Sequence, residues 1–430
     1  MAKSKIPEVY RRWAAISAVA GALARKAWYD FGAFQVYPNM FIILVGEPGI
    51  GKSVSLDIPF EKIFKALSVP VFMNVRSDPD ATHEYSLHQM EQPLRYIQDK
   101  ITPEQLAVDL QSICHADVSH STFEKTAYRA ELTLITSEFG VLMDRNNKNL
   151  QVFLTDIWDG KPEIWYRTKT AGQFYIQGGF LNWIAGATPG QFVDNMPESA
   201  QSQGLLSRLL PIWYEGPRLP QKLRFPKPDK RILEELKQDL ADIASIYGEF
   251  EWATPGLMLE AEEWLEHGER PTEPTMKEYC ERRGAHLMKL LIVVSASRSS
   301  DRIISPEDWV YARDTLLQAE KEMPHALRLF GSTQLGRTSV ELTDMVQSVF
   351  NTNKVGMSLR AFKQAILRRV HNASEVNNLV DTMQGAGLIR VDLEAGHVEP
   401  ADFEPSGLPH SQESKEAQVG YFPPIVRVDA

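Results

Sequence analysis

A glycine-rich stretch that runs into lysine and serine is the clearest chemical pattern in this sequence. Residues 46–53 read GEPGIGKS after an apolar run and satisfy the spacing G-x-x-x-x-G-K-[ST]. In such a loop, backbone N–H groups and the start of the next helix face phosphate oxygens. The pattern predicts bound ATP and Mg²⁺, with Lys52 on the β and γ phosphates and Ser53 on the metal; the alternative is a chance glycine turn. The expected nucleotide contacts are Gly46, Glu47, Pro48, Gly49, Ile50, Gly51, Lys52, Ser53 and Val54.

A second apolar run, residues 132–136, ends in Ser137 and Glu138. Hydrolysis at a phosphate loop needs acidic residues at the tip of a second strand, which hold the metal and polarise the attacking water. We predict Glu138 as the base that activates water. Ser137 takes the place of the first acid and would act on the metal only through a water molecule. The alternatives are an edge strand in which Ser137 caps the next helix, and Asp144 as a weaker candidate acid.

Two further polar residues accompany apolar runs, Thr188 at the end of one and Arg208 inside another. Thr188 follows the strand predicted from residue 180, where a polar side chain can sense the γ-phosphate; a plain strand-to-loop turn is equally compatible with Thr-Pro. Arg208 lies within the apolar run 204–215 and needs a partner. That partner is either the γ-phosphate bound by a neighbouring subunit or an acid of the same chain.

A hairpin is predicted between these strands, because residues 163–168 and 173–176 alternate around a Lys-Thr-Ala-Gly turn. Arg167 and Lys169 lie at its tip, and together with Tyr166 they suit the backbone of single-stranded or forked DNA. A solvated hairpin tip is the alternative.

Residues 340–400 read as three helices followed by two short strands, which predicts a winged helix. Between residues 354 and 371 there are five Lys or Arg and no acid, a pattern that favours nucleic acid and makes Lys363, Arg368 and Arg369 candidate DNA contacts. Use of this unit for protein contacts is the alternative, since its overall charge is near neutral. The segment YFPPIVRV near the end is either a docking peptide or part of a plain terminus.

Composition places the chain among ordinary globular proteins, with 430 residues, 43% hydrophobic and 24% charged. No run of about 18 apolar residues is present, so no membrane partner is expected. Cys114 and Cys280 are far apart and in no metal spacing, which points to a reducing cytoplasm. The net charge of −10 excludes a globally basic nucleic-acid coat but leaves room for a local basic channel.

These patterns together predict an α/β fold with several parts. We expect a phosphate-loop ATPase core with an N-terminal helix over residues 1–245 and a helical lid over 246–335. A winged helix over 336–400 and a disordered tail over 401–430 complete the expected order. Arg282 and Arg283 begin a buried-looking helix of the lid, from which either can reach the nucleotide; a solvated face with salt bridges is the alternative.

In this order, the segments resemble the ATPase domain of phage and prophage replication proteins of the primase-helicase type, over roughly residues 7–330. The resemblance rests on the glycine-rich stretch and on ITSEFGVLM, IAGATPGQF and GLLSRLLPIWYE. The stretch ERRGAHLMKLLIVVSASRSSDRIISPED is similar to the lid of minichromosome-maintenance-type helicases, which belong to the AAA+ ATPases, and its spacing favours Arg282 as the nucleotide-sensing arginine.

The resemblance implies a ring-forming ATPase, hexameric and moving along DNA in a host cytoplasm, with a primase as a further partner. We therefore expect an ATP-driven helicase or translocase of phage-type replication. The alternative is an initiator or helicase loader that binds DNA and acts as a nucleotide switch. Ser137 departs from the pattern of these families and puts fast hydrolysis in doubt. A packaging motor is disfavoured, because residues 340–430 show no acid cluster for a nuclease.

Overall fold

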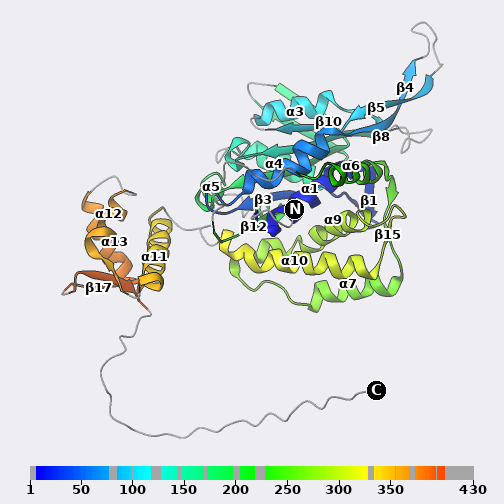
Figure 1. The fold of residues 1–430 in the computed structure, drawn as a ribbon. Helices are drawn as coiled ribbons and strands as arrows, with labels where there is room; N and C mark the ends of the chain where they lie inside the picture. The colour runs from blue at the N-terminus through cyan, green and yellow to red at the C-terminus, as the bar shows by residue number, and fades with distance from the viewer. Residues whose placement is uncertain are drawn as a thin grey trace, which may run out of the picture. The chain divides into compact units, whose positions relative to one another are not determined.

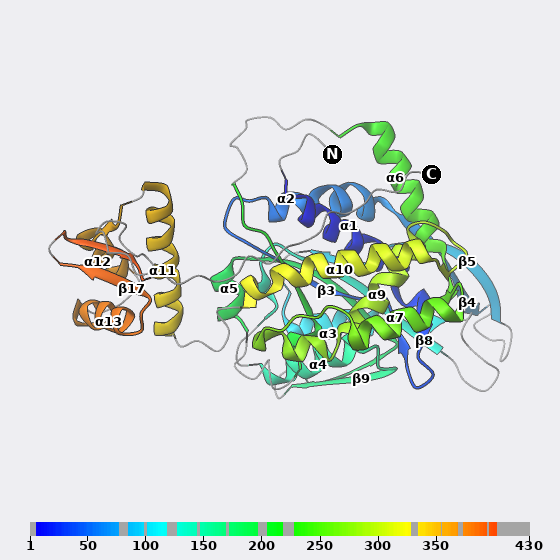
Figure 2. The same cartoon turned by 90° about the horizontal axis from the view of Figure 1, so that it is seen from below.

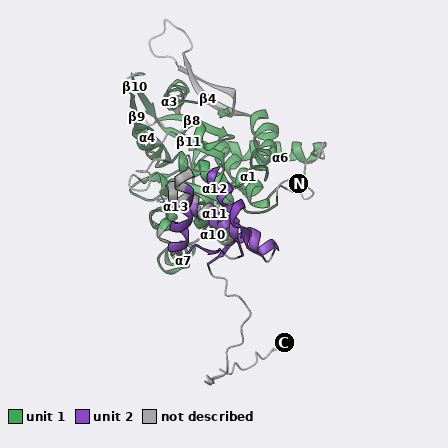
Figure 3. Cartoon of the chain, turned by 90° about the vertical axis from the view of Figure 1, so that its left-hand side faces the viewer, with its two compact units in different colours: residues 1–331 green, residues 332–430 purple. Residues whose placement is uncertain are grey.

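The computed structural model describes residues 6–76, 85–98, 101–117, 127–143, 147–168, 172–196, 204–217, 228–327, 334–353, 355–368, 373–393 and 395–401. The chain divides into two compact units, residues 1–331 and 332–430 (Figure 3). The segments expected as ATPase core and lid thus both belong to the first unit. Lys169, Arg369, Asp144 and the tail from residue 402 lie outside the described residues.

A sheet of five parallel strands forms the centre of the first unit (Figure 1). Its middle strands are buried along their whole length, which explains their continuous apolar sequence, as is usual in parallel sheets covered on both faces. In spatial order the strands are β12 (Leu209–Trp213), β3 (Phe41–Val45), β11 (Gly179–Ala187), β8 (Ala127–Thr136) and β6 (Tyr96–Gln98). The α/β class expected from the sequence is confirmed at this level.

The register of the strands aligns their carboxyl ends. Val45 pairs with Ala187 and with Trp213, while Ala185 pairs with Thr136. The segments that follow β3, β11 and β8 therefore emerge at the same edge of the sheet, here called the carboxyl edge; the opposite edge is the amino edge.

The expected N-terminal helix is α1 (Glu8–Leu23), which packs on the sheet against β11, β3 and β12. Its alanine-rich side permits a close approach, because a Cβ added to Gly21 would lie 2.3 Å from the Thr133 hydroxyl of β8. The Tyr10 hydroxyl donates a hydrogen bond of 2.7 Å to the Val45 carbonyl, which places the start of α1 at the carboxyl edge.

Helices α9 (Arg283–Ala296) and α10 (Pro306–Leu327) pack side by side, and α10 also covers β12 (Figure 2). The remaining helices of this unit surround the sheet; the first four of them lie between its strands in the chain, and the last three follow β12. They are α2 (Lys52–Leu56), α3 (Pro103–Ser112), α4 (Lys148–Trp158), α5 (Pro189–Asp194), α6 (Lys230–Ser245), α7 (Pro255–His267) and α8 (Lys277–Cys280).

Hairpins and short strands extend this framework. The predicted hairpin is present, with Arg167 paired to Gln173. A longer antiparallel hairpin between the glycine-rich stretch and β6 was not predicted. The strands are β9 (Glu163–Thr168) with β10 (Gly172–Gln177), β4 (Ser68–Arg76) with β5 (Tyr85–Pro93), β1 (Ala27–Asp30) with β2 (Gln35–Val36) and β13 (Gly248–Glu249), β7 (His115–Asp117) beside β8, and β14 (Glu251–Trp252) with β15 (Ile303–Ile304).

The second unit has its own hydrophobic core, which includes Phe362, Leu379 and Val398. Three helices and a three-stranded antiparallel sheet enclose this core; the three helices and the last two strands were expected, whereas the strand between the first two helices was not. The elements are α11 (Gln334–Asn353), β16 (Met357–Ser358), α12 (Leu359–Leu367), α13 (Ala373–Gly385), β17 (Ile389–Asp392) and β18 (His397–Pro400).

A group of buried polar side chains ties α9 to the amino edge. The Lys289 amine donates to the Tyr37 carbonyl, the Asn39 side chain and the Trp158 carbonyl, at 2.7–3.0 Å, and burial lowers its pKa well below the usual value. His286 bonds to the Ser207 carbonyl at 2.8 Å and is fully buried. Tyr37 and Asn39 precede β3 and Ser207 precedes β12, so these bonds fix α9 against the start of both strands.

His286 gives the first unit a pH-dependent stability. Burial lowers its pKa from 6.5 to about 3, so the folded state stays neutral where the unfolded chain is protonated. The stability that the neutral imidazole contributes is fully present above pH 6.5 and is lost as the pH falls from 6.5 toward 3. At pH 5 this loss is about 2 kcal/mol. We expect His286→Gln to lose about 2 kcal/mol less stability than the wild type between pH 8 and pH 5.

Urea unfolding followed by tryptophan fluorescence measures this difference. All nine tryptophans lie within residues 1–331, so the signal reports on the first unit alone. The exposed His267 provides the matched control, His267→Gln, which should follow the wild type. Equal pH dependence of wild type and His286→Gln would contradict a buried neutral imidazole.

Candidate functional site

The segment Gly46–Gly51, here called the glycine loop, turns between β3 and α2 at the carboxyl edge. Gly49 and Gly51 have φ of 83° and 102°, which other residues rarely adopt, so glycine is required at both positions. Gly46 needs glycine for a different reason: an added Cβ would lie 2.4 Å from the Tyr10 hydroxyl and 2.8 Å from the Tyr214 carbonyl. Both tyrosines border the loop, and sequence reasoning missed them.

Lys52 folds back over the glycine loop. Its amine donates to the Gly46 carbonyl at 2.5 Å and to the Glu47 carbonyl at 3.0 Å. Burial lowers the pKa of this amine, an effect that Glu47 partly opposes. Ser53 and Val54 follow on the first turn of α2 and are exposed. The loop thus presents a cation, a hydroxyl and turned backbone at one place.

The helix after the loop is α-helical only over Lys52–Leu56. After Leu56 it continues as a wider π-helical stretch, Asp57–Ile63. Pro59 lies in this stretch and has no N–H to donate to the preceding turn, which accounts for the change of winding.

Ser137 and Glu138 follow β8 and are both exposed at the carboxyl edge. The strand between them and the glycine loop is β11, and its Gly186 shows how close the segments lie. A Cβ added to Gly186 would lie 2.6 Å from the Ser137 carbonyl and 3.7 Å from the Lys52 Cβ. The structure therefore brings the predicted base segment and the predicted phosphate-binding lysine together.

Thr188 is also at this edge, where it caps α5. Its hydroxyl accepts a hydrogen bond from the Gln191 N–H at 3.2 Å, and the Gln191 side chain accepts one from the Thr188 N–H, forming a capping box. The hydroxyl has a structural role in this arrangement, which is close to the plain turn considered from the sequence.

Arg208 lies at the amino edge and has a partner within the chain. Its guanidinium makes two hydrogen bonds with the Asp159 carboxylate, at 3.0 and 2.6 Å, and one with the Gly204 carbonyl at 2.6 Å. The side chain is buried, and the intrachain salt bridge is the alternative that the sequence left open. In this state Arg208 is not presented to a neighbouring subunit.

Arg282 and Arg283 do not join the residues around the glycine loop. Arg282 precedes α9, whose His286 and Lys289 are fixed at the amino edge, about 16 Å across β3 from the loop. Arg283 is buried in an ion pair with Glu320 at 2.7 Å. The Arg282 side chain makes no hydrogen bond or ion pair with another described residue. The expectation that either arginine reaches the nucleotide of its own chain therefore finds no support in this arrangement.

The exposed face of the hairpin β9–β10 carries Trp165 and Arg167, whereas Tyr166 lies on its inner face. Tyr166 is 1% exposed and packs against Phe153, so its expected contact with nucleic acid is wrong. Trp165 is 47% exposed and stacks on Tyr175 with 4.4 Å between ring centroids. Arg167 is exposed on the same face, with its guanidinium 5.2 Å from the Trp165 ring. Because the side chains of a strand alternate between its two faces, an exposed Arg167 implies that Trp165 is exposed and that Tyr166 faces the protein interior.

Two of the basic residues of the second unit, Arg360 and Lys363, lie on α12. Arg368, which follows this helix, is exposed, while Lys363 is half-buried and donates to the Asn377 side chain at 3.0 Å. Helix α13 has no lysine or arginine in its sequence and carries Glu375 and Asp381. Basic residues of this unit also lie on α11 (Arg337) and β17 (Arg390), so α13 differs from its neighbours in having none.

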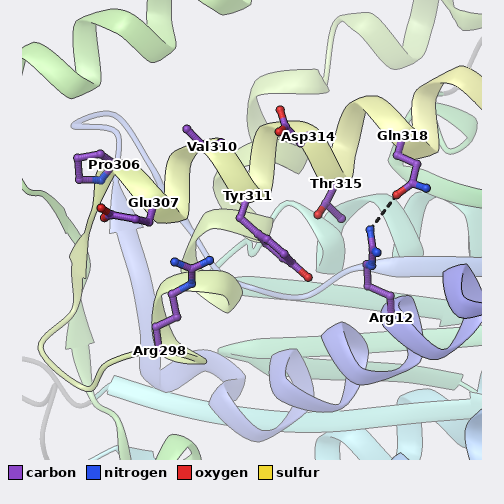
Figure 4. Close-up of a pocket in the computed structure, with 9 residues that line it drawn as sticks. All are labelled: Arg12, Arg298, Pro306, Glu307, Val310, Tyr311, Asp314, Thr315 and Gln318. Carbon is purple, nitrogen blue, oxygen red and sulfur yellow. Dashed lines mark hydrogen bonds between the residues drawn. The ribbon is translucent and has the colours of Figure 1, made fainter. Parts of the chain in front are cut away.

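A separate cavity of about 550 Å³ lies between α1 and α10 (Figure 4). Tyr311 projects into it between Arg298 and Arg12, and the Arg12 guanidinium donates to the Gln318 side chain at 2.8 Å. Arg298 is paired with Asp308 at 3.2 Å. Arg12 and Gln318 thus pair within the cavity, whereas Asp308 is not part of its lining, and no residue of the glycine loop lines it.

Three further findings concern metal sites, membrane-spanning helices and known proteins. Within the described residues, no group of three or more His, Cys, Asp or Glu side chains is placed to hold a metal ion. None of the described helices is long and apolar enough to cross a membrane. No protein-family model matches the chain, and no curated protein matches it.

The contact at Gly186 predicts a specific sensitivity. Gly186→Ala places a methyl group against the Ser137 backbone, which cannot move without shifting β8, so we expect a loss of about 1–3 kcal/mol in unfolding free energy. Gly190→Ala is the matched control, because open space surrounds Gly190 in α5. Urea unfolding measures both, and a Gly186→Ala variant as stable as Gly190→Ala would disprove the close approach.

Proposed function

We propose that this protein is an ATPase that works on DNA, most simply as a helicase or translocase of phage-type replication. One observation carries the proposal: the glycine loop with Lys52 and the segment with Glu138 meet at one edge of a parallel sheet, on either side of Gly186. Phosphoryl transfer to water needs a phosphate cradle and a water-orienting acid together.

The residues at this edge fit ATP and Mg²⁺. The turned backbone at Gly49 and Gly51 and the Lys52 amine suit phosphate oxygens. Ser53 would hold Mg²⁺, which when bound neutralises charge on the phosphates. Glu138 would accept a proton from the attacking water. The placement of β11 between β3 and β8 supports an AAA+-like core, because it sets the glycine loop beside the segment with Glu138.

The hairpin β9–β10 supports DNA as the substrate. Stacked aromatic rings beside an arginine are the combination that holds single-stranded nucleic acid, because bases stack on the rings and the cation meets the phosphate backbone. Trp165, Tyr175 and Arg167 form this combination on one exposed face. Lys169 would add a second cation beside it.

An initiator or loader that acts as a nucleotide switch is the second candidate. Ser137 favours it, because a serine in place of the metal-binding acid slows hydrolysis more than nucleotide binding. Lys363, Arg368 and Arg369 would then contact DNA from the second unit. For either function we also propose a hexameric ring, a nucleotide site shared between neighbouring copies, and a primase as a partner. Arg208 would serve such a composite site only after leaving Asp159.

The hydrolysis proposal predicts different effects for its two central residues. Lys52→Ala removes the phosphate contact and should abolish both nucleotide binding and turnover. Glu138→Gln removes only the base, so turnover should fall about 10²–10⁴-fold while a fluorescent ATP analogue still binds.

A phosphate-release assay and a binding titration measure these effects, with and without single-stranded DNA. Lys62→Ala and Asp57→Asn, exposed on the π-helical stretch, control for charge alone and should match the wild type. Wild-type turnover in Glu138→Gln would rule out Glu138 as the base. Turnover that is slow and indifferent to DNA would favour the switch.

The DNA proposal predicts that the hairpin contributes to affinity for single strands. Trp165→Ala should weaken binding by about 1–3 kcal/mol through loss of stacking. Arg167→Ala should lower the slope of log affinity against log salt by about 0.7. Fluorescence anisotropy of a labelled oligonucleotide measures both. Val152→Ala and Arg231→Ala, exposed on α4 and α6, are the controls. Unchanged affinity in both hairpin variants would exclude this face.

A further inference from the structure

The second unit carries a groove that its own core does not fill. A cavity of about 630 Å³ lies between α12 and the start of α13, beside the turn at Gly396. Its walls include the apolar side chains of Leu359, Leu367 and Val376, and Leu367 is 52% exposed. Arg360 and Lys363 also line it. An apolar floor beside two cations suits an apolar segment whose flanking sequence carries acids.

Nucleic acid fits this groove poorly. A phosphate backbone gains little from leucine and valine, and α13, which contributes Val376 and Asn377 to the groove, contains no lysine or arginine. Exposed apolar patches of this kind more often mark contacts with protein.

The chain contains a segment with the complementary chemistry. Residues 421–428 read YFPPIVRV, in which apolar side chains flank two prolines. Proline fixes φ near −65° and prepares an extended conformation, so such segments dock in apolar grooves at low entropic cost. The eight residues carry one charge, that of Arg427, and Asp429 follows them directly; residues 402–430 as a whole contain five acids and two bases, a net charge of −3.

The connection is long enough for docking within one chain. Strand β18 ends at Pro400, in the same unit as the groove, and 19 residues, 402–420, separate the described chain from Tyr421. Nineteen residues can span at most about 60 Å. A tether of this kind also raises the local concentration of the segment to the millimolar range, so a weak contact is sufficient.

We propose that residues 421–428 dock in the groove between α12 and α13 of their own chain. The apolar side chains of the segment cover Leu359, Leu367 and Val376, and the acids near it face Arg360 and Lys363. The docked segment shields the α12 cations, so that a ligand of this surface must displace it. This proposal does not depend on nucleotide binding or hydrolysis.

A peptide-binding experiment tests the proposal. The chain ending at residue 401 is titrated against a fluorescein-labelled peptide of residues 413–430, and anisotropy is measured. The truncated chain should bind the peptide at least tenfold more tightly than the full chain, whose own segment competes. Leu367→Glu in the truncated chain should weaken binding at least tenfold. Val355→Glu, at a similarly exposed apolar position outside the groove, should not.

Hydrogen exchange gives a second test that needs no added peptide. Amides of α12 should exchange more slowly in the full chain than in the truncated one, while those of α11 should not differ. Equal exchange in α12, or equal peptide affinity of Leu367→Glu and Val355→Glu, would overturn the proposal. Oligomers that dissociate on truncation would also overturn it, because they would place the segment in a second copy. A DNA duplex that binds through Leu367 and Lys363, while the peptide does not bind, would do the same.

Discussion

The parallel register of β3, β11 and β8 is the constraint on which the rest of this molecule depends. Because β3 and β11 are buried along their whole length, a slip of either by one residue would turn its side chains to the wrong layer. The register sets the carboxyl ends of the three strands side by side, and Gly46 and Gly186 let the segments beyond them approach without a side chain between. The chemistry of this edge thus follows from backbone packing as much as from the polar residues themselves.

The opposite edge is held by buried cations whose charges are satisfied locally. Lys289 and Asn39 bind the carbonyls that end α4, and Arg208 binds Asp159 one residue beyond that helix. Carbonyl groups at a helix end are the negative pole of its dipole, so cations are stabilising there. Since α4 leads directly into β9, this arrangement also gives the exposed hairpin a rigid base that is shared with α9.

Much of this could be predicted from local pattern, and the remainder depends on contacts between distant segments. The glycine loop, the hairpin and the helix over Glu8–Leu23 follow from spacing and alternation. The partner of Arg208 does not, because Asp159 lies 49 residues away and only the fold brings the two together. The position of Arg282 follows from the packing of α9, which no spacing encodes. Tyr166 is buried because the side chains of β9 alternate between two faces, and the exposed Arg167 puts its neighbour Tyr166 on the inner face.

The two units have separate hydrophobic cores, one containing Phe41 and Trp183 and the other Phe362 and Leu379. Each core is complete within one continuous stretch of sequence, and the boundary falls next to residue 331. The consequence is evolutionary. Recombination at that point exchanges or removes the second unit without exposing the core of the first, so lineages can retain the glycine-loop unit while acquiring a different C-terminal module.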